Sequence, residues 1–458
     1  MTTRYSVIGL GKLGASILAA IASRGQDAIG VDVSPRAVDA INAGLAPVQE
    51  TDLSETIAAN REHLAATLSC REAVLASDVT FVVVPTPSDR RGAFSLQQVA
   101  SAFTEIGQAL AHKDGYHLVV LTSTVLPGAT RYGLLPVLER ASGKVCGQDF
   151  GLCYSPEFIA LGSVIHDFLH PDFTLVGEHD ERAGSALEAC YAELLCDRPP
   201  CHRMSIENAE LAKIALNAYV TTKITFANML ADLCERIPGG DVDAVTGALG
   251  ADRRIGPRYL KGALGYGGPC FPRDNLALSF SARALGTQAE LAMATDAANR
   301  CLPERILARL RPILRPGMVV AILGLAYKPL TCVVEESQAI RLAQLLAREG
   351  AHVIGYDPLA GKAAEGPLSG VAMVVDTLEA CLEQAEIVLI TTPDPAFRAL
   401  TAASFAHAHG EVAVVDFWRI LPDALAGRRG IRYLPVGLST DDATNSGRLA
   451  ELWQGAVG

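Results

Sequence analysis

The segment GYGGPCFPRD, residues 265–274, carries the residue types of a covalent catalyst. Its glycines and prolines suit neither a helix nor a strand, and loops of this kind are often retained for function. Arg273 can favour the thiolate form of Cys270, and Asp274 can hold a water molecule or receive a proton. Elsewhere a cysteine is usually a small buried hydrophobe. The loop therefore favours a nucleophilic thiol at Cys270.

A second polar constellation lies in NAELAKIALNAY, where Lys213 and Asn217 are four residues apart. This spacing puts both side chains on one face of a predicted helix that is otherwise rich in Ala, Leu and Ile. An ammonium and an amide directed into a cleft can stabilise an oxyanion, which develops when an alcohol is oxidised and when a thiol adds to an aldehyde. The alternative is a lysine that reaches solvent along its stem and an amide satisfied at a helix interface.

A third motif, Gly9, Gly11 and Gly14, forms GxGxxG directly between the strand-like YSVI and the helical run ASILAAIASRG. These glycines permit a tight turn, approach of the backbone to a pyrophosphate, and close packing of helix on strand. Asp32 ends the next predicted strand, where a carboxylate accepts both ribose hydroxyls and repels a 2′-phosphate. The pattern predicts an NAD site and favours NAD over NADP. The alternative is a domain of this type that has lost its cofactor.

The elements that must position these residues fall into three regions. Strand-like runs alternate with helical stretches up to about Cys196, helical periodicity dominates from Ser205 to about Ala298, and strands return after Pro316. Such alternation predicts two doubly wound, parallel α/β domains, with the active site in the cleft between them. The expected strands are YSVIGL, DAIGVDV, VTFVVVP, HLVVLTS, FGLCYSP and FTLVGE in the first region, and MVVAILGL, HVIGYD, AEIVLIT and EVAVVDF in the last. The predicted domains are residues 1–203, 204–300 and 313–458.

The composition excludes several classes of function. A net charge of −11 with no clustered Lys and Arg argues against a nucleic-acid surface, and 50% hydrophobic residues argue against disorder. No run approaches the roughly 20 apolar residues of a membrane span, and the N-terminus enters a strand pattern without an export signal. Eleven cysteines without CxxC pairs fit reduced thiols in a cytoplasm. We expect no metal site and no membrane partner.

Over nearly its whole length, the chain resembles the UDP-glucose/GDP-mannose dehydrogenase family. The matching stretches occur in family order, and members of the family have two Rossmann-like domains joined by a long helix that also forms the dimer core. The resemblance therefore implies an NAD-binding domain, a helical dimerisation domain and a nucleotide-sugar-binding domain, in a homodimer or higher homo-oligomer. The matching stretches are VIGLGKLG, VPTPSD, STVLPGAT, SPEFIALGSVIHDF, AELAKIALNAY, DRRIGPRYLKGALGYGGPCFPRD, GLAYKP and YDP.

The resemblance also implies a mechanism with two hydride transfers to two NAD molecules and no release of the aldehyde. Cys270 matches the nucleophile that traps the aldehyde as a thiohemiacetal, which is then oxidised to a thioester. Lys213 and Asn217 match the oxyanion-stabilising pair. Thr124 and Asp274 match a pair that organises water, and Glu157 matches the residue implicated in hydrolysis of the thioester.

Other positions match cofactor and substrate contacts of the family. Arg254 matches an arginine that often reaches the site of the neighbouring subunit. The implied NAD contacts are Gly9, Gly11, Leu13, Gly14, Asp32, Thr86 and Thr124. The implied substrate contacts, besides Lys213, Asn217 and Arg254, are Phe158, Ile159, Gly267, Lys328 and the loop Tyr259 to Ala263, which includes Leu260.

Several positions depart from the family pattern. Residues 156–162 read PEFIALG where the family has PEFLREG, so Ala160 and Leu161 replace an arginine and an acid that is usually near NAD. Residues 331–337 read TCVVEES where the family has TDDxRES. Cys332 and Val333 thus replace two acids, and Glu335 replaces an arginine that meets a pyrophosphate. Met229 after Asn228 replaces a glutamate, a milder change. We expect loose NAD binding, unless another cation such as Arg341 compensates.

Three functions remain open. The leading one is four-electron oxidation of a nucleotide-sugar C6 hydroxyl to the uronic acid, with UDP-glucose as substrate and GDP-mannose or a UDP-N-acetylhexosamine as alternatives. The second is a two-electron dehydrogenase of the β-hydroxyacid or 6-phosphogluconate type, which would not need Cys270. The third is a nucleotide-sugar binding protein with little catalysis, suggested by the changes at Leu161 and Glu335.

Overall fold

The computed structural model describes residues 3–89, 91–159, 161–406 and 410–454. The chain divides into two compact units, Met1–Leu216 with Phe280–Thr287, and Asn217–Ser279 with Gln288–Gly458. Within the described part of the chain, no helix combines the length and the apolar character needed to cross a membrane.

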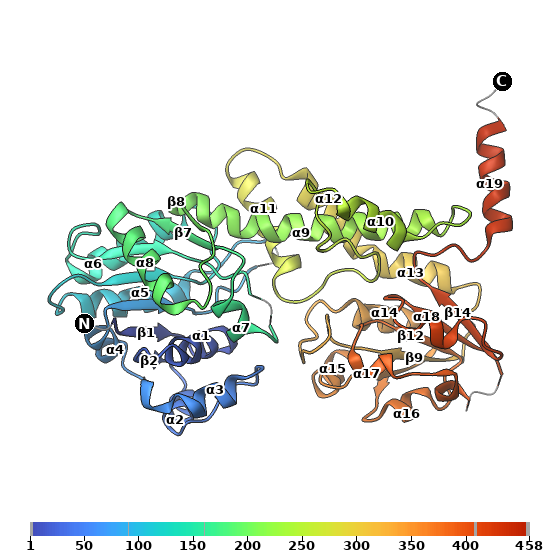
Figure 1. Ribbon diagram of the computed structural model, residues 1–458, viewed down its shortest axis with the longest axis horizontal. Helices are drawn as coiled ribbons and strands as arrows, with labels where there is room; N and C mark the ends of the chain where they lie inside the picture. The colour runs from blue at the N-terminus through green and yellow to red at the C-terminus, as the bar shows by residue number, and fades with distance from the viewer. Residues whose placement is uncertain (1–2, 90, 160, 407–409, 455–458) are drawn as a thin grey trace. The chain divides into compact units, whose positions relative to one another are not determined.

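The first unit is built on an eight-stranded sheet with the order β3-β2-β1-β4-β5-β6-β7-β8 (Figure 1). All neighbouring strands are parallel except β6 and β7, which pair antiparallel. The strands are β1 (Tyr5–Ile8), β2 (Ala28–Val31), β3 (Leu64–Thr67), β4 (Val79–Val82), β5 (Leu118–Leu121), β6 (Gly151–Tyr154), β7 (Thr174–Glu178) and β8 (Cys201–Ser205).

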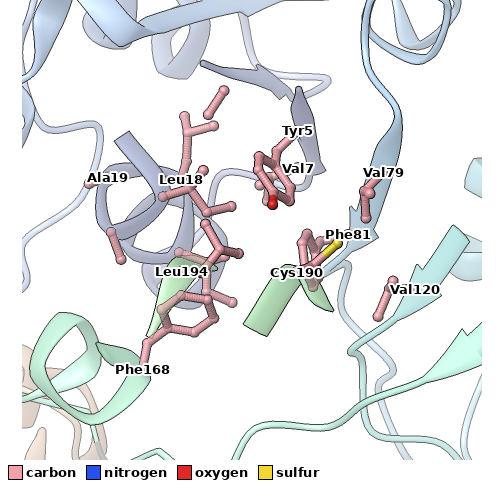
Figure 2. Packing of buried hydrophobic residues seen from close by; sticks show 14 of the residues in the cluster. Tyr5, Val7, Leu18, Ala19, Val79, Phe81, Val120, Phe168, Cys190 and Leu194 are labelled. Carbon is pink, nitrogen blue, oxygen red and sulfur yellow. The ribbon is translucent and has the colours of Figure 1, made fainter. Parts of the chain in front are cut away.

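Alternating side chains of this sheet supply two separate hydrophobic cores. Tyr5 and Val7 of β1 belong to one core, whereas Ile8 belongs to the other, as the two-residue period of a strand requires. Figure 2 shows Tyr5 and Val7 near Leu18 and Phe81 in the first core. Because both faces are covered by helices, the central strands are buried on both sides, which explains their unbroken apolar runs.

Helices pack on both faces of the sheet. The core that contains Tyr5 takes its helical residues mainly from α1 (Lys12–Ser23), α3 (Leu53–Ala59), α7 (Val164–Leu169) and α8 (Glu181–Leu194), and Ile41 of α2 (Pro35–Asn42) also belongs to it. The opposite core takes them mainly from α4 (Cys70–Ala76), α5 (Gln97–Leu110) and α6 (Leu135–Ser142). The remaining elements are a 3₁₀ turn at Arg61–His63 and a π-helical turn at Ala129–Leu134.

Two helices cross the boundary between the units. The longer, α9 (Ile206–Cys234), has 29 residues and agrees with the uninterrupted helical pattern predicted after Ser205. The other, α11 (Phe271–Ala284), begins directly after Cys270. The remaining helices of this region are α10 (Val242–Ala251), α12 (Glu290–Arg300) and α13 (Leu302–Leu310).

The second unit contains a six-stranded sheet, entirely parallel, with the order β11-β10-β9-β12-β13-β14. Alternate strand residues again feed two cores, with Val320 and Ile322 in one and Ala321 and Leu323 in the other. Its strands are β9 (Val319–Leu323), β10 (His352–Tyr356), β11 (Ala372–Val374), β12 (Ile387–Ile390), β13 (Val412–Asp416) and β14 (Ile431–Pro435). Its helices are α14 (Gln338–Arg348), α15 (Gly361–Leu368), α16 (Leu378–Leu382), α17 (Pro395–Arg398), α18 (Pro422–Leu425) and α19 (Asp442–Gln454), with a 3₁₀ turn at Ala402–Phe405.

The predicted fold class is confirmed, because the chain forms two α/β sheets with a helical region between them in the sequence. The antiparallel β6–β7 pair was not expected. The predicted three-domain boundaries remain a prediction.

Candidate active site

The β1–α1 turn requires glycine at two of its three motif positions. Gly9 has φ +99°, and a Cβ on Gly14 would lie 1.8 Å from the carbonyl oxygen of Gly9. Gly11 is exposed at the N-cap of α1, and a Cβ there would meet no atom within 4 Å among the described residues. The turn thus leaves open space over the amide groups of the helix N-terminus, where a pyrophosphate binds favourably. The partly buried Leu13 lies in the first turn of α1.

Asp32 directly follows β2, as predicted, and its carboxylate is fixed by the backbone. Oδ2 accepts a hydrogen bond from Leu10 N at 2.7 Å, and Oδ1 accepts one from Ser34 N at 2.8 Å. Each carboxylate oxygen can accept more than one hydrogen bond, so the group can still accept ribose hydroxyls. The Gly9 to Gly14 turn and Asp32 therefore fit an NAD adenosine half.

Two threonines follow neighbouring strands of the same sheet. Thr86 follows β4, and its Oγ1 donates to the carbonyl oxygen of Thr124, which follows β5, at 2.7 Å. Ser123 Oγ also donates to Val84 O at 2.7 Å. These bonds fix the two strand ends together, so Thr86 and Thr124 lie at the carboxyl edge of the sheet, where doubly wound folds bind ligands.

Lys213 on α9 contacts the segment that follows β6. Its Nζ donates to the carbonyl oxygen of Glu157 at 2.6 Å and lies 4.7 Å from the ring centroid of Phe158. Burial raises the pKa of the Glu157 carboxyl to about 7, and the positive charge of Lys213 opposes that rise. A carboxyl with a pKa near neutrality suits a general base. Ile159 is partly buried beside them.

In the second unit, Asn217 and Asp274 form a buried pair. Asn217 Nδ2 donates to Asp274 Oδ2 at 2.6 Å, and Arg273 Nε donates to Oδ1 at 3.0 Å. Asp274 has no exposed surface. Both of its oxygens accept hydrogen bonds, which fix the position of the carboxyl group. The role predicted for Arg273 towards the thiol stays a prediction.

Cys270 is exposed immediately before α11. Its carbonyl oxygen accepts a hydrogen bond from Asp274 N at 2.8 Å, so it lies at the N-terminal end of the helix. The partial positive charge at this end favours a thiolate. The sequence analysis did not anticipate this helix end beside Cys270.

The glycines before Cys270 are required by close packing. Gly268 has φ +81°, its N donates to Glu335 O at 2.9 Å, and a Cβ there would lie 2.6 Å from the ring of Tyr327. A Cβ on Gly267 would lie 2.4 Å from Glu336 O. The Cys270 loop thus lies against the segment that departs from the family. Lys328, three residues before that segment, is partly buried, and its Nζ lies 5.9 Å from the ring centroid of Tyr327.

The remaining predicted substrate contacts lie near the end of α10. Tyr259 is exposed with φ +64°, whereas Leu260 is buried. Arg254 is highly exposed and its Nη2 pairs with Asp252 at 2.6 Å. The structure places these residues within the same unit as Cys270, and their contacts with a substrate remain a prediction.

Three models of one family cover the chain. The NAD binding domain of the UDP-glucose/GDP-mannose dehydrogenase family matches residues 3–195, its central domain residues 207–301, and its UDP binding domain residues 321–423. The chain belongs to the UDP-glucose/GDP-mannose dehydrogenase family. It is accordingly an NAD-dependent oxidoreductase, as predicted.

Members of this family are similar over almost the full length. A UDP-glucose 6-dehydrogenase of Haloferax volcanii is 38% identical and is matched over 86% of this chain and 92% of its own. A GDP-mannose 6-dehydrogenase of Azotobacter vinelandii is 31% identical, over 93% and 98%. The structure of a UDP-glucose dehydrogenase from Pyrobaculum islandicum, at 33% identity, superposes with a TM-score of 0.86 over 96% of this chain and 98% of its own.

Two of the positions that depart from the UDP-glucose/GDP-mannose dehydrogenase pattern can be described further. Glu335 is exposed, and Arg341, suggested as a compensating cation, pairs instead with Glu304 through Nη2 at 2.7 Å. Leu161 is partly buried, and Ala160 lies outside the described residues. The expectation of loose NAD binding stays a prediction.

Positioning residues on α9 were missed by the sequence reading. Asn228 Oδ1 accepts from Ala263 N at 2.8 Å, anchoring the end of the loop that begins at Tyr259. Glu210 accepts from Gly128 N at 2.5 Å and Thr130 N at 2.8 Å, fixing the turn after Thr124. A signal existed, because buried polar residues recur along this helix of the dehydrogenase with helical spacing. They are Glu210, Lys213, Asn217, Thr221 and Asn228.

Proposed function

We propose that the protein oxidises the C6 hydroxyl of UDP-glucose to the carboxylate of UDP-glucuronate. One sugar alcohol, two NAD⁺ and one water give one carboxylate, two NADH and three protons. The observation that carries this proposal is the exposed Cys270 at the N-terminus of α11, one helical turn before the buried Asp274–Asn217 pair. A two-electron dehydrogenase has no use for such a thiol.

The predicted domains receive matching roles. Residues 1–203 hold NAD on the Gly9 to Gly14 turn and Asp32, and residues 313–458 bind the nucleotide sugar. When bound, NAD⁺ accepts the hydride that leaves the substrate carbon in each oxidation. We place the reaction in the cytoplasm, where NAD is available and the cysteines stay reduced.

In the first oxidation, the chain stabilises the oxygen of the alcohol as its proton leaves. The Lys213 ammonium and the Asn217 amide are hydrogen-bond donors suited to that developing charge. Thr124 and Asp274 match the family's water-organising pair, and we propose that role for them. Lys213 already donates to the backbone of Glu157, which limits the positions that its ammonium can take.

Cys270 then retains the aldehyde. Its sulfur attacks the aldehyde carbon, the C–S bond forms, and the carbonyl oxygen takes a proton to give a thiohemiacetal. The second oxidation removes the remaining hydrogen from that carbon and the proton from its oxygen, which leaves a thioester.

Glu157 is the base for the last step. It takes a proton from water as the water oxygen bonds to the thioester carbon. The C–S bond breaks, the carboxylate leaves, and Cys270 returns as the thiolate. A pKa of about 7 leaves a large fraction of Glu157 ionised at neutral pH and still basic enough to act.

The sugar is tested with a panel of UDP-glucose, GDP-mannose, UDP-GlcNAc and UDP-ManNAc, following NADH absorbance and the acid formed. UDP-glucose is expected to give two NADH per sugar at the highest kcat/KM. A higher kcat/KM for GDP-mannose or for a UDP-N-acetylhexosamine would show that this sugar nucleotide, and not UDP-glucose, is the substrate. One NADH per sugar would indicate the two-electron alternative, and none would indicate a binding protein.

We also propose a homodimer formed through α9 and its surroundings. Large apolar side chains at heptad spacing remain exposed on this helix: Tyr219 at 60%, Phe226 at 44%, Met229 at 43% and Leu233 at 50%. Exposed apolar rows of this kind usually mark an association surface. Residues 204–300 then serve both assembly and catalysis.

A further inference from the structure

Three side chains with metal-ligating atoms meet in the first unit, away from the proposed catalytic groups. Cys146, His179 and Asp180 each offer one ligand atom, and these atoms lie within 4.8 Å of one another. Cys146 comes from the α6–β6 loop, and the other two from the β7–α8 turn. Because β7 runs antiparallel to β6, this turn lies beside the start of β6, whereas Glu157 follows its end.

Two buried oxygen atoms at this place lack hydrogen-bond partners among the described residues. They are Asp180 Oδ2 and the hydroxyl of Tyr116. Asp180 Oδ1 is occupied, because it caps α8 by accepting from Ala183 N at 3.0 Å. A charged oxygen removed from water without a partner is costly, so an unpaired Oδ2 points to a missing ligand.

The loop backbone lies within ordinary van der Waals range of the same side chains. Gly147 has φ +83°, and a Cβ there would lie 3.5 Å from Asp180 Oδ2 and 3.8 Å from His179 Cδ2. Cys146 is buried directly before it. The three donors are therefore held by two connected turns.

We propose that Cys146, His179 and Asp180 bind one Zn²⁺ ion through sulfur, nitrogen and oxygen, with water as the fourth ligand. One sulfur, one imidazole and one carboxylate form a donor set that zinc accepts. A thiolate and a carboxylate also balance the two charges of the ion. Tetrahedral zinc needs ligand atoms roughly 3.3 to 3.8 Å apart, so the side chains draw together by about 1 Å.

Binding requires two protons to move. Zinc is bound by the thiolate, so the thiol proton of Cys146 passes to solvent as the S–Zn bond forms. Arg131 Nη1 lies 3.2 Å from His179 Nδ1. If His179 ligates through Nε2, its proton moves to Nδ1 and Arg131 turns towards Glu207, its ion-pair partner.

Two further charged side chains near the cluster have partners of their own. The Arg182 guanidinium lies 3.6 Å from the ring centroid of Tyr116. Glu139 Oε1 accepts from Cys146 N at 3.1 Å. The site is remote from the chemistry of oxidation, so we assign it a structural role, which is to fix the α6–β6 loop against the β7–α8 turn.

The test is a zinc titration of the full chain against a chromogenic chelator, in a Cys270→Ser background so that the proposed catalytic thiol cannot contribute. One equivalent of zinc is expected per chain. Cys146→Ser and Asp180→Asn should each weaken binding by at least about tenfold. Asparagine still caps α8, so Asp180→Asn tests the ligand without removing the cap. Cys196→Ser removes an exposed thiol outside the cluster and should bind as the parent does.

Cobalt gives a second reading on the same proteins. Co²⁺ should produce a thiolate charge-transfer band and the intense visible bands of tetrahedral geometry, and Cys146→Ser should remove the former. Zinc should also raise the thermal midpoint of the parent but not that of Asp180→Asn. The proposal is overturned if the parent binds no zinc, or if Cys146→Ser and Asp180→Asn bind it as the parent does.

Discussion

The amide of Asn217 on α9 donates to the carboxylate of Asp274 on α11, with 2.6 Å between Nδ2 and Oδ2. Asp274 is fully buried, so this bond replaces the water that a charged carboxylate would otherwise hold. It also joins a helix that carries proposed oxyanion donors to the helix that begins after Cys270.

Asn217→Ala is expected to lower the free energy of unfolding by about 1 to 3 kcal/mol, because one buried carboxylate oxygen loses its donor. The variant should also lower kcat, since an oxyanion donor is lost. Asn228→Ala is the matched control, because Asn228 is equally buried on α9 but bonds to the loop at Ala263. Asn228→Ala should raise KM more than it lowers kcat. Equal kinetic effects of the two variants would contradict the role of Asn217.

Cys270→Ser should abolish net formation of the acid, because a hydroxyl without an adjacent base is too weak a nucleophile to trap the aldehyde. Acid is measured by chromatography and NADH by absorbance. Cys301→Ser, a change to another exposed thiol of the same unit, should leave acid as the product. Full acid production by Cys270→Ser would exclude the covalent route.

Hydrolysis of the thioester should accelerate as pH rises through about 7, because burial raises the pKa of Glu157 to that value and only the carboxylate is a base. In Glu157→Gln the rise of the hydrolysis rate around pH 7 should disappear. Acid release should also slow by about 10²- to 10⁴-fold. Rapid-quench measurement of acid across pH 5 to 9 tests this. If the rate of the variant still rose near pH 7, that rise would belong to the ionisation of another group.

The same pKa predicts the pH dependence of stability. Between about pH 4.5 and 7 the folded carboxyl keeps its proton while the unfolded one has lost it, so the folded state binds more protons. The contribution of Glu157 to stability is therefore full below pH 4.5 and declines as pH rises to 7. The free energy of unfolding, measured with urea, should fall between pH 4.5 and 7 more in the wild type than in Glu157→Gln.

Glu335→Arg is expected to tighten NAD binding by roughly tenfold to a hundredfold, since a charge-assisted phosphate contact contributes about 1.5 to 3 kcal/mol. Arg341→Ala should have little effect, because Arg341 pairs with Glu304. Calorimetry at fixed salt measures both variants, since salt screens exposed charges. A change below threefold in Glu335→Arg would show that residues 331–337 do not lie at the pyrophosphate.

Leu233→Glu should dissociate the proposed homodimer, because a charge in an apolar interface loses its hydration without a partner. Light scattering after size-exclusion chromatography measures the mass. Leu285→Glu changes an equally apolar and more exposed residue outside the row and should leave the mass unchanged. A wild-type monomer, or a dimer that tolerates Leu233→Glu, would exclude this surface.

The strands that the sequence predicted and those that it missed differ in burial. All strands with fully buried patterns, such as β1, β4 and β12, were predicted from their apolar runs. The four missed strands, β3, β8, β11 and β14, are the outermost strands of the two sheets and are mostly half-buried. An edge strand has one neighbour and needs fewer apolar residues, so its pattern is weak.

The candidate site also contains features that local sequence patterns predict and features that they do not. The turn at Gly9 and the acid at Asp32 are local patterns that sequence order reveals, and the structure has both as expected. The bonds from Asn228 to Ala263 and from Glu210 to Thr130 span 35 and 80 positions. Such partners are brought together by tertiary packing, and no local spacing encodes them.

The two rows of side chains on α9, one polar and buried and one apolar and exposed, restrict how the chain can change during evolution. The helix buries Asn217 and Thr221 while it exposes Phe226 and Leu233, and a single angular register fixes both rows. Each residue added or removed within it would turn everything downstream by about 100°. Substitutions along α9 can thus be tolerated one at a time, but an insertion or deletion there would misplace amide, hydroxyl and apolar side chains together. Homologous chains should vary in length in their surface loops and keep this helix constant.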